Sequence, residues 1–291
     1  MSQTEISAVI PISGEVKPAG RRRRAGSDGR FFLIMGGISS SFVLLIVLML
    51  LADLAFTSVQ DFKDALMKPE IQAAIWLTLL SCTVSAILSV WVATPLGYVL
   101  ARYRFPGRWL VDTLIDIPIV LPPLVLGLSL LILFHLEIGG WQLERWLRNT
   151  FDFQVTFAWP AVILAQFSVA CAFAVRAMRM TFEQMNARAE DVARTLGYSR
   201  GQAFLYIALP QAEQGMLTAL TISWARSLGE FGPILVFAGS TRMKTEVLST
   251  TVFLELSTGN LPAAVAVSLL MVFVAVVVLI FLRLLGSEAI R

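Results

Sequence analysis

Long apolar segments constrain this chain more than any other feature of its sequence. A helix needs about 20 mostly apolar residues to cross a bilayer, and six segments of the 291-residue chain meet that requirement. They lie near residues 31–57, 71–100, 111–135, 157–177, 212–238 and 259–284. Charged residues make up only 15% of the chain, whereas soluble domains contain about 25%. The sequence therefore predicts an all-α membrane protein with six transmembrane helices.

The distribution of basic residues predicts how these spans are oriented, because Lys and Arg collect in cytoplasmic loops. With the N-terminus in the cytoplasm, the inside segments contain most of the basic residues of the chain. The outside segments then contain only Lys63, Lys68, Arg145, Arg148, Arg242 and Lys244. We therefore expect a multi-pass membrane protein whose N- and C-termini are both cytoplasmic.

Residues 1–30 differ in composition from the rest of the chain. They are polar, contain Pro, Gly and Ser, and include four consecutive arginines at positions 21–24. Such a segment cannot bury enough apolar surface to fold, so we expect a disordered, basic cytoplasmic tail. The apolar run that follows is longer than the roughly 7–15 residues of a signal-peptide core. This length favours an uncleaved first span and a transmembrane domain over residues 31–291.

A short polar loop at about residues 184–210 separates two of the apolar segments. Asn186 can cap the start of a helix there, and Gly197 can end one in the left-handed conformation. Between them, four residues at spacing i, i+3, i+4 and i+7 share one helical face: Ala189, Val192, Ala193 and Leu196. A short helix with such a face fits a groove in a partner protein. The alternative is an amphipathic helix lying on the membrane surface.

A second polar feature lies inside the fifth span. Arg226 and Glu230 are four residues apart, so on a helix they would share a face. A charge at the bilayer centre costs about 3 kcal/mol unless it faces protein or water. Gly229 and Gly232 weaken the helix at this point. We expect these four residues and Ser227 to form part of a path or gate through the membrane, and a purely structural ion pair is the alternative.

The sequence contains no convincing catalytic or metal-binding constellation. It has no Gly-x-x-x-x-Gly-Lys-[Ser/Thr] phosphate-binding loop. His135 is the only histidine, and Cys82 and Cys171 lie within spans, where cysteine is usually a small core residue. We therefore expect neither an enzyme nor a cofactor or metal site on this chain.

The polar loop resembles the EAA loop of the ABC-importer permeases, whose pattern is Glu-Ala-Ala, three residues, Gly, nine residues and Ile-x-Leu-Pro. The spacing is kept here by Asp191, Val192, Ala193, Gly197, Ile207 and Pro210, with Asp191 replacing the Glu of the pattern and Val192 its first Ala. In that family the loop docks on an ATPase subunit. The resemblance assigns this coupling role to Ala189, Glu190, Asp191, Val192, Ala193, Leu196, Gly197, Ile207 and Pro210.

Other stretches resemble the molybdate and sulfate branch of the same family. Residues 225–232 read Ala-Arg-Ser-Leu-Gly-Glu-Phe-Gly, residues 104–108 read Arg-Phe-Pro-Gly-Arg, and residues 116–123 read Asp-Ile-Pro-Ile-Val-Leu-Pro-Pro. The segment 248–260 is similar to tungstate permeases. The resemblance implies transport of a tetrahedral oxyanion, which could be molybdate, sulfate, thiosulfate or tungstate.

The resemblance also implies the type I ABC importer permease fold in a bacterial-type inner (plasma) membrane. The partners would be a cytoplasmic ATPase dimer, a second permease subunit of the same or a related chain, and an extracytoplasmic solute-binding protein, with no nucleic acid. ATP and Mg would bind the ATPase and not this chain. Two alternatives stay open, which are an ABC permease for another small solute and an ATP-independent secondary transporter.

Overall fold

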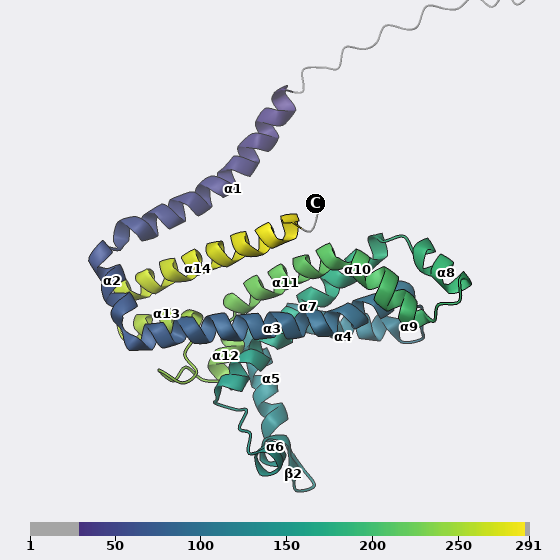
Figure 1. The fold of residues 1–291 in the computed structure, drawn as a ribbon. Helices are drawn as coiled ribbons and strands as arrows, with labels where there is room; N and C mark the ends of the chain where they lie inside the picture. Colours follow the sequence, from purple (N-terminus) through teal and green to yellow (C-terminus); the bar gives the residue numbers. More distant parts are fainter. Residues whose placement is uncertain (1–28, 289–291) are drawn as a thin grey trace, which may run out of the picture. The chain divides into compact units, whose positions relative to one another are not determined.

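The computed structural model describes residues 29–288, most of which are helical (Figure 1). The chain divides into two compact units, residues 1–49 and residues 50–291. Helix α1 (Gly29–Phe56) begins in the first unit and ends in the second. The predicted tail at residues 1–30 lies outside the described residues, apart from the two positions that begin α1.

Within the described residues, four helices are long and apolar enough to cross a membrane. They are residues Phe31–Phe56 of α1, helix α3 (Pro69–Arg102), helix α7 (Trp159–Gln184) and residues Leu261–Leu284 of α14 (Leu261–Glu288). Helices α4 (Arg108–Val120) and α5 (Pro123–His135) pass the same test together, but the chain bends by 114° between them.

The six predicted spans are therefore not all single helices among the described residues. The third predicted span is the bent pair α4 and α5. The fifth, residues 212–238, forms two shorter helices, α11 (Glu213–Leu228) and α12 (Gly232–Phe237). Hydrophobic composition finds segments of the right length, but it does not show where the backbone within a segment changes direction.

Proline explains the break in the third predicted span. Helix α4 ends at Val120 with a hydrogen bond from the Leu121 N–H to the Ile117 oxygen at 2.9 Å. Pro122 and Pro123 have no N–H group to continue this ladder, and a proline ring crowds the carbonyl four residues earlier. Helix α5 can begin at Pro123, because the first helical position needs no donor. These prolines therefore account for the break between α4 and α5.

Glycine explains how the two halves of the fifth predicted span pack. Gly229 ends α11, and α12 begins at Gly232. A Cβ atom on Gly232 would lie 2.9 Å from the Pro123 Cβ and 3.0 Å from the Leu124 nitrogen. Only glycine therefore lets α12 approach α5 this closely.

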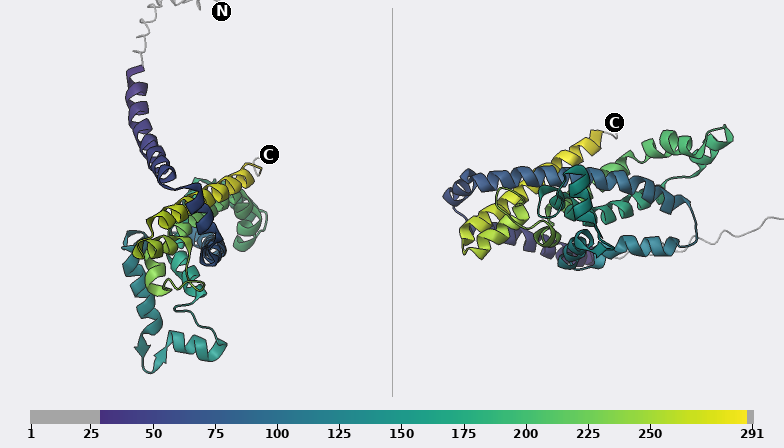
Figure 2. Two further views of the ribbon diagram at one scale, coloured as in Figure 1. Left: turned by 90° about the vertical axis from the view of Figure 1, so that its left-hand side faces the viewer. Right: turned by 90° about the horizontal axis from the view of Figure 1, so that it is seen from below.

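Shorter elements connect the long helices. They are α2 (Val59–Met67), the antiparallel hairpin β1 (Glu137–Ile138) and β2 (Trp141–Gln142), α6 (Leu143–Phe151), α8 (Arg188–Thr195), α9 (Arg200–Ala203), the π-helix η1 (Phe204–Ala208), α10 (Leu209–Gln211) and α13 (Leu248–Ser257). The β hairpin and α6 project beyond the end of α5 (Figures 1 and 2). Helices α8 and α9 lie near the C-terminal end of α3, and α2 and α13 lie near its N-terminal end (Figure 1).

The core forms where α3, α7 and α11 pack together. A Cβ atom on Gly97 of α3 would lie 2.8 Å from the Arg179 nitrogen of α7, so a small residue is needed at this contact. Small residues at such interfaces let membrane helices approach closely. Cys82 is buried and Cys171 half-buried, and both are free thiols, as expected for core cysteines.

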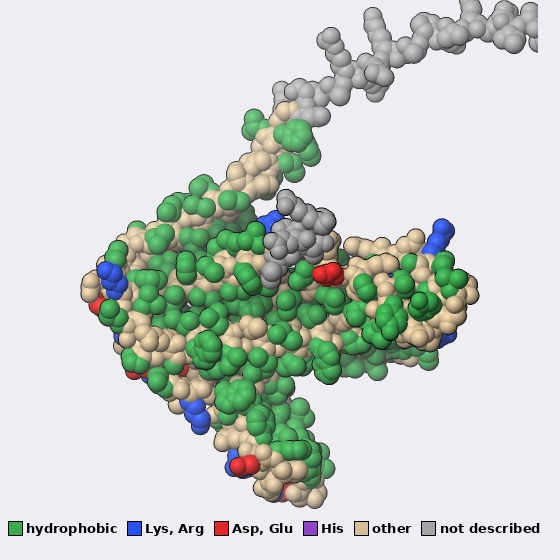
Figure 3. Space-filling view, in the orientation of Figure 1, with side chains coloured by type: hydrophobic (Ala, Val, Ile, Leu, Met, Phe, Trp, Pro, Cys, Tyr) green, Lys and Arg blue, Asp and Glu red, His purple; other side chains and the backbone are tan. Residues whose placement is uncertain are grey.

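The outer surface of the helices is strongly apolar. Hydrophobic side chains cover most of the face visible in Figure 3. Trp76 and Trp91 of α3 and Phe273 and Phe281 of α14 are among the large exposed side chains. A surface of this kind is stable in contact with lipid and not with water.

Candidate functional site

The polar loop between α7 and α11 contains the short helix α8 at its predicted place. The Asn186 side chain accepts a hydrogen bond from the Arg188 N–H at 3.0 Å, immediately before the first turn. At the other end, the Tyr198 N–H donates to the Ala193 oxygen and the Gly197 N–H to the Arg194 oxygen, both at 3.1 Å. These two bonds form a Schellman motif, which needs a residue with positive φ. Gly197 supplies it at φ +96°.

The predicted face of α8 is divided between two environments. Ala189, Val192 and Leu196 are exposed, and the exposed fractions of Val192 and Leu196 are 57% and 75%. Ala193 is instead buried against its own chain, together with Glu190. The prediction that Ala193 shares an outward face with the other three is therefore wrong.

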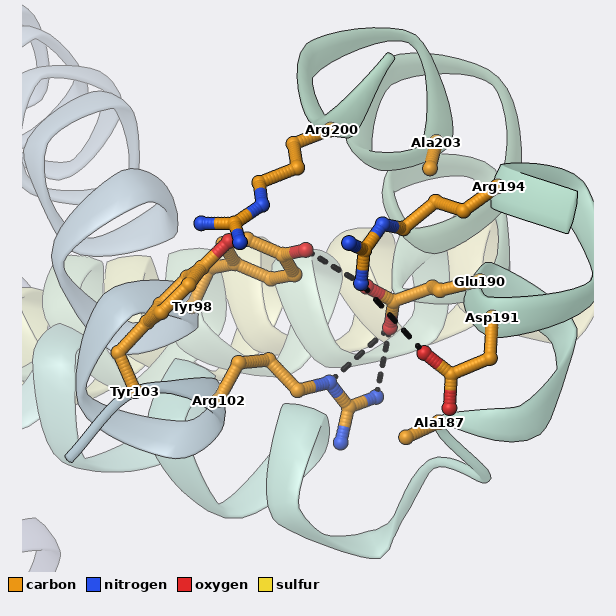
Figure 4. Close-up of a pocket in the computed structure, with 9 residues that line it drawn as sticks. All are labelled: Tyr98, Arg102, Tyr103, Ala187, Glu190, Asp191, Arg194, Arg200 and Ala203. Carbon is orange, nitrogen blue, oxygen red and sulfur yellow. Dashed lines mark hydrogen bonds and ion pairs between the residues drawn. The ribbon is translucent and has the colours of Figure 1, made fainter. Parts of the chain in front are cut away.

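Glu190 explains why α8 is oriented in this way. Its Oε2 accepts a hydrogen bond from the Tyr98 hydroxyl at 2.6 Å, and its Oε1 accepts one from Arg102 Nε at 3.0 Å (Figure 4). Arg102 Nη2 also lies 2.9 Å from Oε1. The same guanidinium donates to the Met185 oxygen at 3.3 Å. A buried carboxylate needs such partners, so the contact fixes the Glu190 side of α8 against α3.

The sequence did not identify Tyr98 or Arg102 as functional residues. Arg102 counted only as one of the basic residues that orient the spans. A signal was present, since the two residues are four apart at the end of a predicted helix and so share a face. Glu190 was grouped with the docking residues, whereas the structure directs its side chain inward.

A pocket of about 250 Å³ lies beside this contact (Figure 4). It is lined by Arg102, Arg194 and Arg200 together with Asp191. Asp191 has 70% of its side chain exposed and lies 3.8 Å from Arg194. Asp191 is therefore accessible at the surface of the loop, whereas the preceding Glu190 is buried.

The remaining coupling residues lie where the chain returns toward the bundle. Ile207 is half-buried in the π-helix η1, and Pro210 is exposed in α10. Pro210 has no N–H to donate to residue 206, and its ring would crowd that carbonyl. The Leu209 N–H bonds to the Phe204 oxygen, five residues earlier. The backbone forms a wider π-helical turn at this point, which is consistent with the missing N–H group of Pro210 and the space that its ring requires.

The charged pair of the fifth predicted span straddles the end of a helix. Arg226 lies in the last turn of α11, and Glu230 follows the end of that helix. Arg226 Nη1 lies 2.6 Å from Glu230 Oε2, with 30% and 2% of the two side chains exposed. The sequence predicted that both residues lie on one helix. In the structure α11 ends between them, but they still form an ion pair.

The neighbours of this pair differ in exposure. The Arg226 guanidinium lies 5.8 Å from the centroid of the Phe173 ring. Ser249 Oγ donates to the Glu230 backbone oxygen at 2.7 Å. Gly229 is exposed, whereas Ser227 is 1% exposed and its hydroxyl has no hydrogen-bond partner within the described part of the chain. Of the five predicted path residues, Arg226 and Gly229 therefore reach the surface, and Ser227, Glu230 and Gly232 are buried.

Comparisons with known proteins agree with this arrangement. Residues 93–289 match the family model described as binding-protein-dependent transport system inner membrane component. The sulfate transport system permease protein CysT of Escherichia coli (strain K12) is 35% identical, over 82% of this chain and 85% of its own length. The molybdate/tungstate transport system permease protein WtpB of Thermococcus kodakarensis is 36% identical, over 58% of this chain and 62% of its own.

A solved structure supports the fold. It is a bacterial alginate ABC transporter in complex with an alginate pentasaccharide-bound periplasmic protein. One of its chains aligns with 90% of this chain and 96% of its own length, with a TM-score of 0.69 and 18% sequence identity. The described helices therefore have the same fold as this chain of an ABC transporter.

Proposed function

This chain belongs to the family of binding-protein-dependent inner-membrane transport components, and we propose that it is the membrane subunit of an ABC importer for a tetrahedral oxyanion. The observation that carries the proposal is the two-sided helix α8. One side is held to α3 by Glu190, and the other presents Val192 and Leu196 to the surroundings. A helix that is fixed inside and apolar outside suits the transmission of motion from a docked partner.

The proposed partner on the outward side of α8 is a cytoplasmic ATPase. The sequence has no phosphate-binding loop of its own, so ATP and Mg would bind another chain. Exposed Leu196 and Val192 would fill an apolar groove of that ATPase, and Asp191 would meet a basic residue at its rim. Two ATPase copies would serve two permease subunits, each with one such helix.

The inward side would transmit the movement of the ATPase. When ATP binding closes the ATPase dimer, α8 moves with it, and Glu190 pulls on Arg102 and Tyr98 at the end of α3. The same loop connects directly to α7 and α11, which pack on α3. Three core helices would therefore respond together. Such a change is a two-state equilibrium biased by a ligand on another subunit.

The proposed substrate is a small anion with tetrahedral geometry. Relatives that transport sulfate and molybdate or tungstate support this class. The sequence around Arg226, which resembles that branch, lies at the break between α11 and α12. An extracytoplasmic solute-binding protein would deliver the anion. Sulfate is the first candidate, because the sulfate permease aligns over most of this chain.

Uptake measurements test this proposal. Cells that lack the gene and cells in which it is restored should be compared for uptake of labelled sulfate, thiosulfate, molybdate and tungstate. We expect one of these anions to accumulate only in the restored cells, and only while ATP is available. Unchanged uptake of all four would favour another small solute. Uptake that continues after ATP depletion, with the proton gradient intact, would support a secondary transporter.

A further inference from the structure

Two grooves flank α11, and their chemistry differs. Between α11 and α3 lies an apolar groove whose lining includes Met216 and Leu220. Between α11 and α7 lies a groove of about 600 Å³ whose lining includes Gln214, Thr218 and Arg176. The two sides of one helix are therefore built for different surroundings. The first suits lipid or an apolar helix. Most of the lining surface of the second is apolar, but it also offers amide, hydroxyl and guanidinium groups to water or a polar solute, and we call it the polar groove because it is the more polar of the two.

Close packing fixes the floor of the polar groove. Gly215 of α11 lies directly against Thr181 of α7, and a Cβ atom at Gly215 would overlap the Thr181 side chain. The two helix backbones therefore approach closely here. Gln214, next to this contact on α11, and Gln184, at the end of α7, are both exposed along the groove.

One end of the polar groove lies close to Arg226, the cation of the charged pair. Phe173 and Ile222 both line it. The Arg226 guanidinium lies over the Phe173 ring, and Ile222 is one turn before Arg226 on the same helix. At its other end the groove reaches Gln184 and Gln211, which are the last residues of α7 and α10. It therefore leads from the break after α11 to the loop that contains α8.

The groove holds donors but little net charge. Arg176 is paired with Asp116, with Nη2 2.8 Å from Oδ1, and Arg226 is paired with Glu230. None of the lining residues in the described part of the chain is a carboxylate. The side-chain amides of Gln184 and Gln214 can each donate two hydrogen bonds. Neutral donors between balanced cations hold an anion weakly, and weak holding is what conduction requires.

We propose that the groove between α7 and α11 is the cytoplasmic half of the oxyanion path, with the amides of Gln184 and Gln214 as its hydrogen-bond donors. The inference rests on the proposed function, because it assumes that an oxyanion crosses this protein. Polar side chains in contact with lipid would be costly, so a water-filled path also accounts for Gln214 and Thr218 on this side of α11.

Substitution of Gln214 gives the first test. Gln214→Glu keeps the size of the side chain but replaces a donor with a negative charge, so uptake should fall by roughly tenfold or more. Gln214→Met removes the donor without adding charge and should give a smaller loss. Met216→Leu, on the apolar side of the same helix, serves as the control. For every variant, the amount of permease in the membrane and the amount of ATPase bound to it are measured.

Cysteine accessibility gives the second test. In a background with Cys82→Ala and Cys171→Ala, Thr218→Cys and Leu220→Cys are exposed to a small anionic methanethiosulfonate in inside-out vesicles. We expect Thr218→Cys to react, sulfate or molybdate to slow that reaction, and Leu220→Cys to stay unmodified. The rate of this reaction is measured with and without the anion that the uptake assay identifies as transported.

The outcomes separate the two proposals. If the unmodified protein transports no oxyanion, the proposed function is wrong. If it transports one but Gln214→Glu does so equally well, only the assignment of the groove is wrong. A disulfide between two Thr218→Cys copies would also overturn the groove assignment, because the face would then be covered by a second copy of the chain.

Discussion

The Tyr98 hydroxyl lies 2.6 Å from Glu190 Oε2, across 92 residues of sequence. This bond and the Arg102 ion pair join the end of α3 to α8. A hydrogen bond to a charged group contributes about 1.5–3 kcal/mol, so this junction stabilises the position of α8 against α3. The adjacent Asp191, in contrast, has 70% of its side chain exposed and lies 3.8 Å from Arg194 of the same helix.

This contrast predicts that neighbouring carboxylates have separable roles. Glu190→Gln and Tyr98→Phe should leave the ATPase bound but reduce its stimulation by the loaded binding protein by about fivefold or more. Asp191→Asn should instead weaken co-purification of the ATPase. Stimulated and basal ATP hydrolysis, measured with co-purification, distinguish these effects. Equal loss of ATPase binding in all three variants would show that Glu190 only stabilises the loop.

The C-terminus of α8 gives a second prediction. At φ +96°, Gly197 occupies a conformation that β-branched residues rarely adopt. Gly197→Val should disrupt the Schellman motif and abolish uptake, at a local cost of about 1–2 kcal/mol. Gly197→Asn should be milder, since asparagine tolerates left-handed backbone. Uptake and ATPase co-purification are the measurements, and normal values for Gly197→Val would exclude a need for this cap.

The exposed tip of α8 is tested separately. Leu196→Arg should prevent ATPase binding while the permease stays inserted, because 75% of Leu196 is exposed. Ala193→Arg should have a different effect. Ala193 is 5% exposed, so an arginine there would push α8 away from its own chain. The first variant should keep normal membrane levels, and the second should lower them.

These residues also show what sequence reasoning could reach. The start and end of α8 were predictable, because caps depend on residues within a few positions of the helix end. The inward direction of Glu190 was not, since it depends on Tyr98 and Arg102, 92 and 88 residues away. The prolines between α4 and α5 predicted a break, but its 114° bend follows from packing of α5 against α12.

Orientation in the membrane is a fourth prediction. Single cysteines at Ser199 and Thr241, both exposed positions, are treated in intact cells with a thiol label that cannot cross the membrane. The background again lacks Cys82 and Cys171. Thr241→Cys should react and Ser199→Cys should not, because basic loops stay in the cytoplasm. Labelling of Ser199→Cys would place α8 outside and contradict ATPase docking.

A buried carboxylate in the loop before α13 predicts a pH dependence of stability. Glu246 is 3% exposed, and burial raises its pKa above the usual carboxyl range. The nearby Glu255 and Glu70 add to this effect, and Thr251 and Arg242 oppose it. The folded protein therefore holds the proton more tightly than the unfolded chain, so stability falls as pH rises from the usual carboxyl pKa toward the raised one.

Thermal unfolding of the purified protein in detergent measures this effect. The unfolding midpoint should decrease as pH rises above the usual Glu pKa of about 4.3, and Glu246→Gln should make the profile flatter. Glu137→Gln is the matched control, because 54% of the Glu137 side chain is exposed. A slope that is the same in both variants would assign the dependence to other groups.

The last prediction concerns the unequal burial of Arg226 and Glu230. Removing one partner of a buried pair strands the other, at a cost of about 3–5 kcal/mol. Arg226→Gln would strand Glu230, which is 2% exposed, whereas Glu230→Gln would strand Arg226, which is 30% exposed and lies over Phe173. We therefore expect Arg226→Gln to lower membrane levels more than Glu230→Gln.

The exchange of Arg226→Glu with Glu230→Arg then separates a path role from a packing role. It restores the attraction but moves the cation into the buried position after α11. We expect the exchanged protein to insert and bind its ATPase without transporting oxyanion, because the anion would no longer meet a cation at the end of the α7–α11 groove. Near-normal uptake would reduce the pair to a packing contact, and the break between α11 and α12 would then lose its only proposed substrate-facing charge.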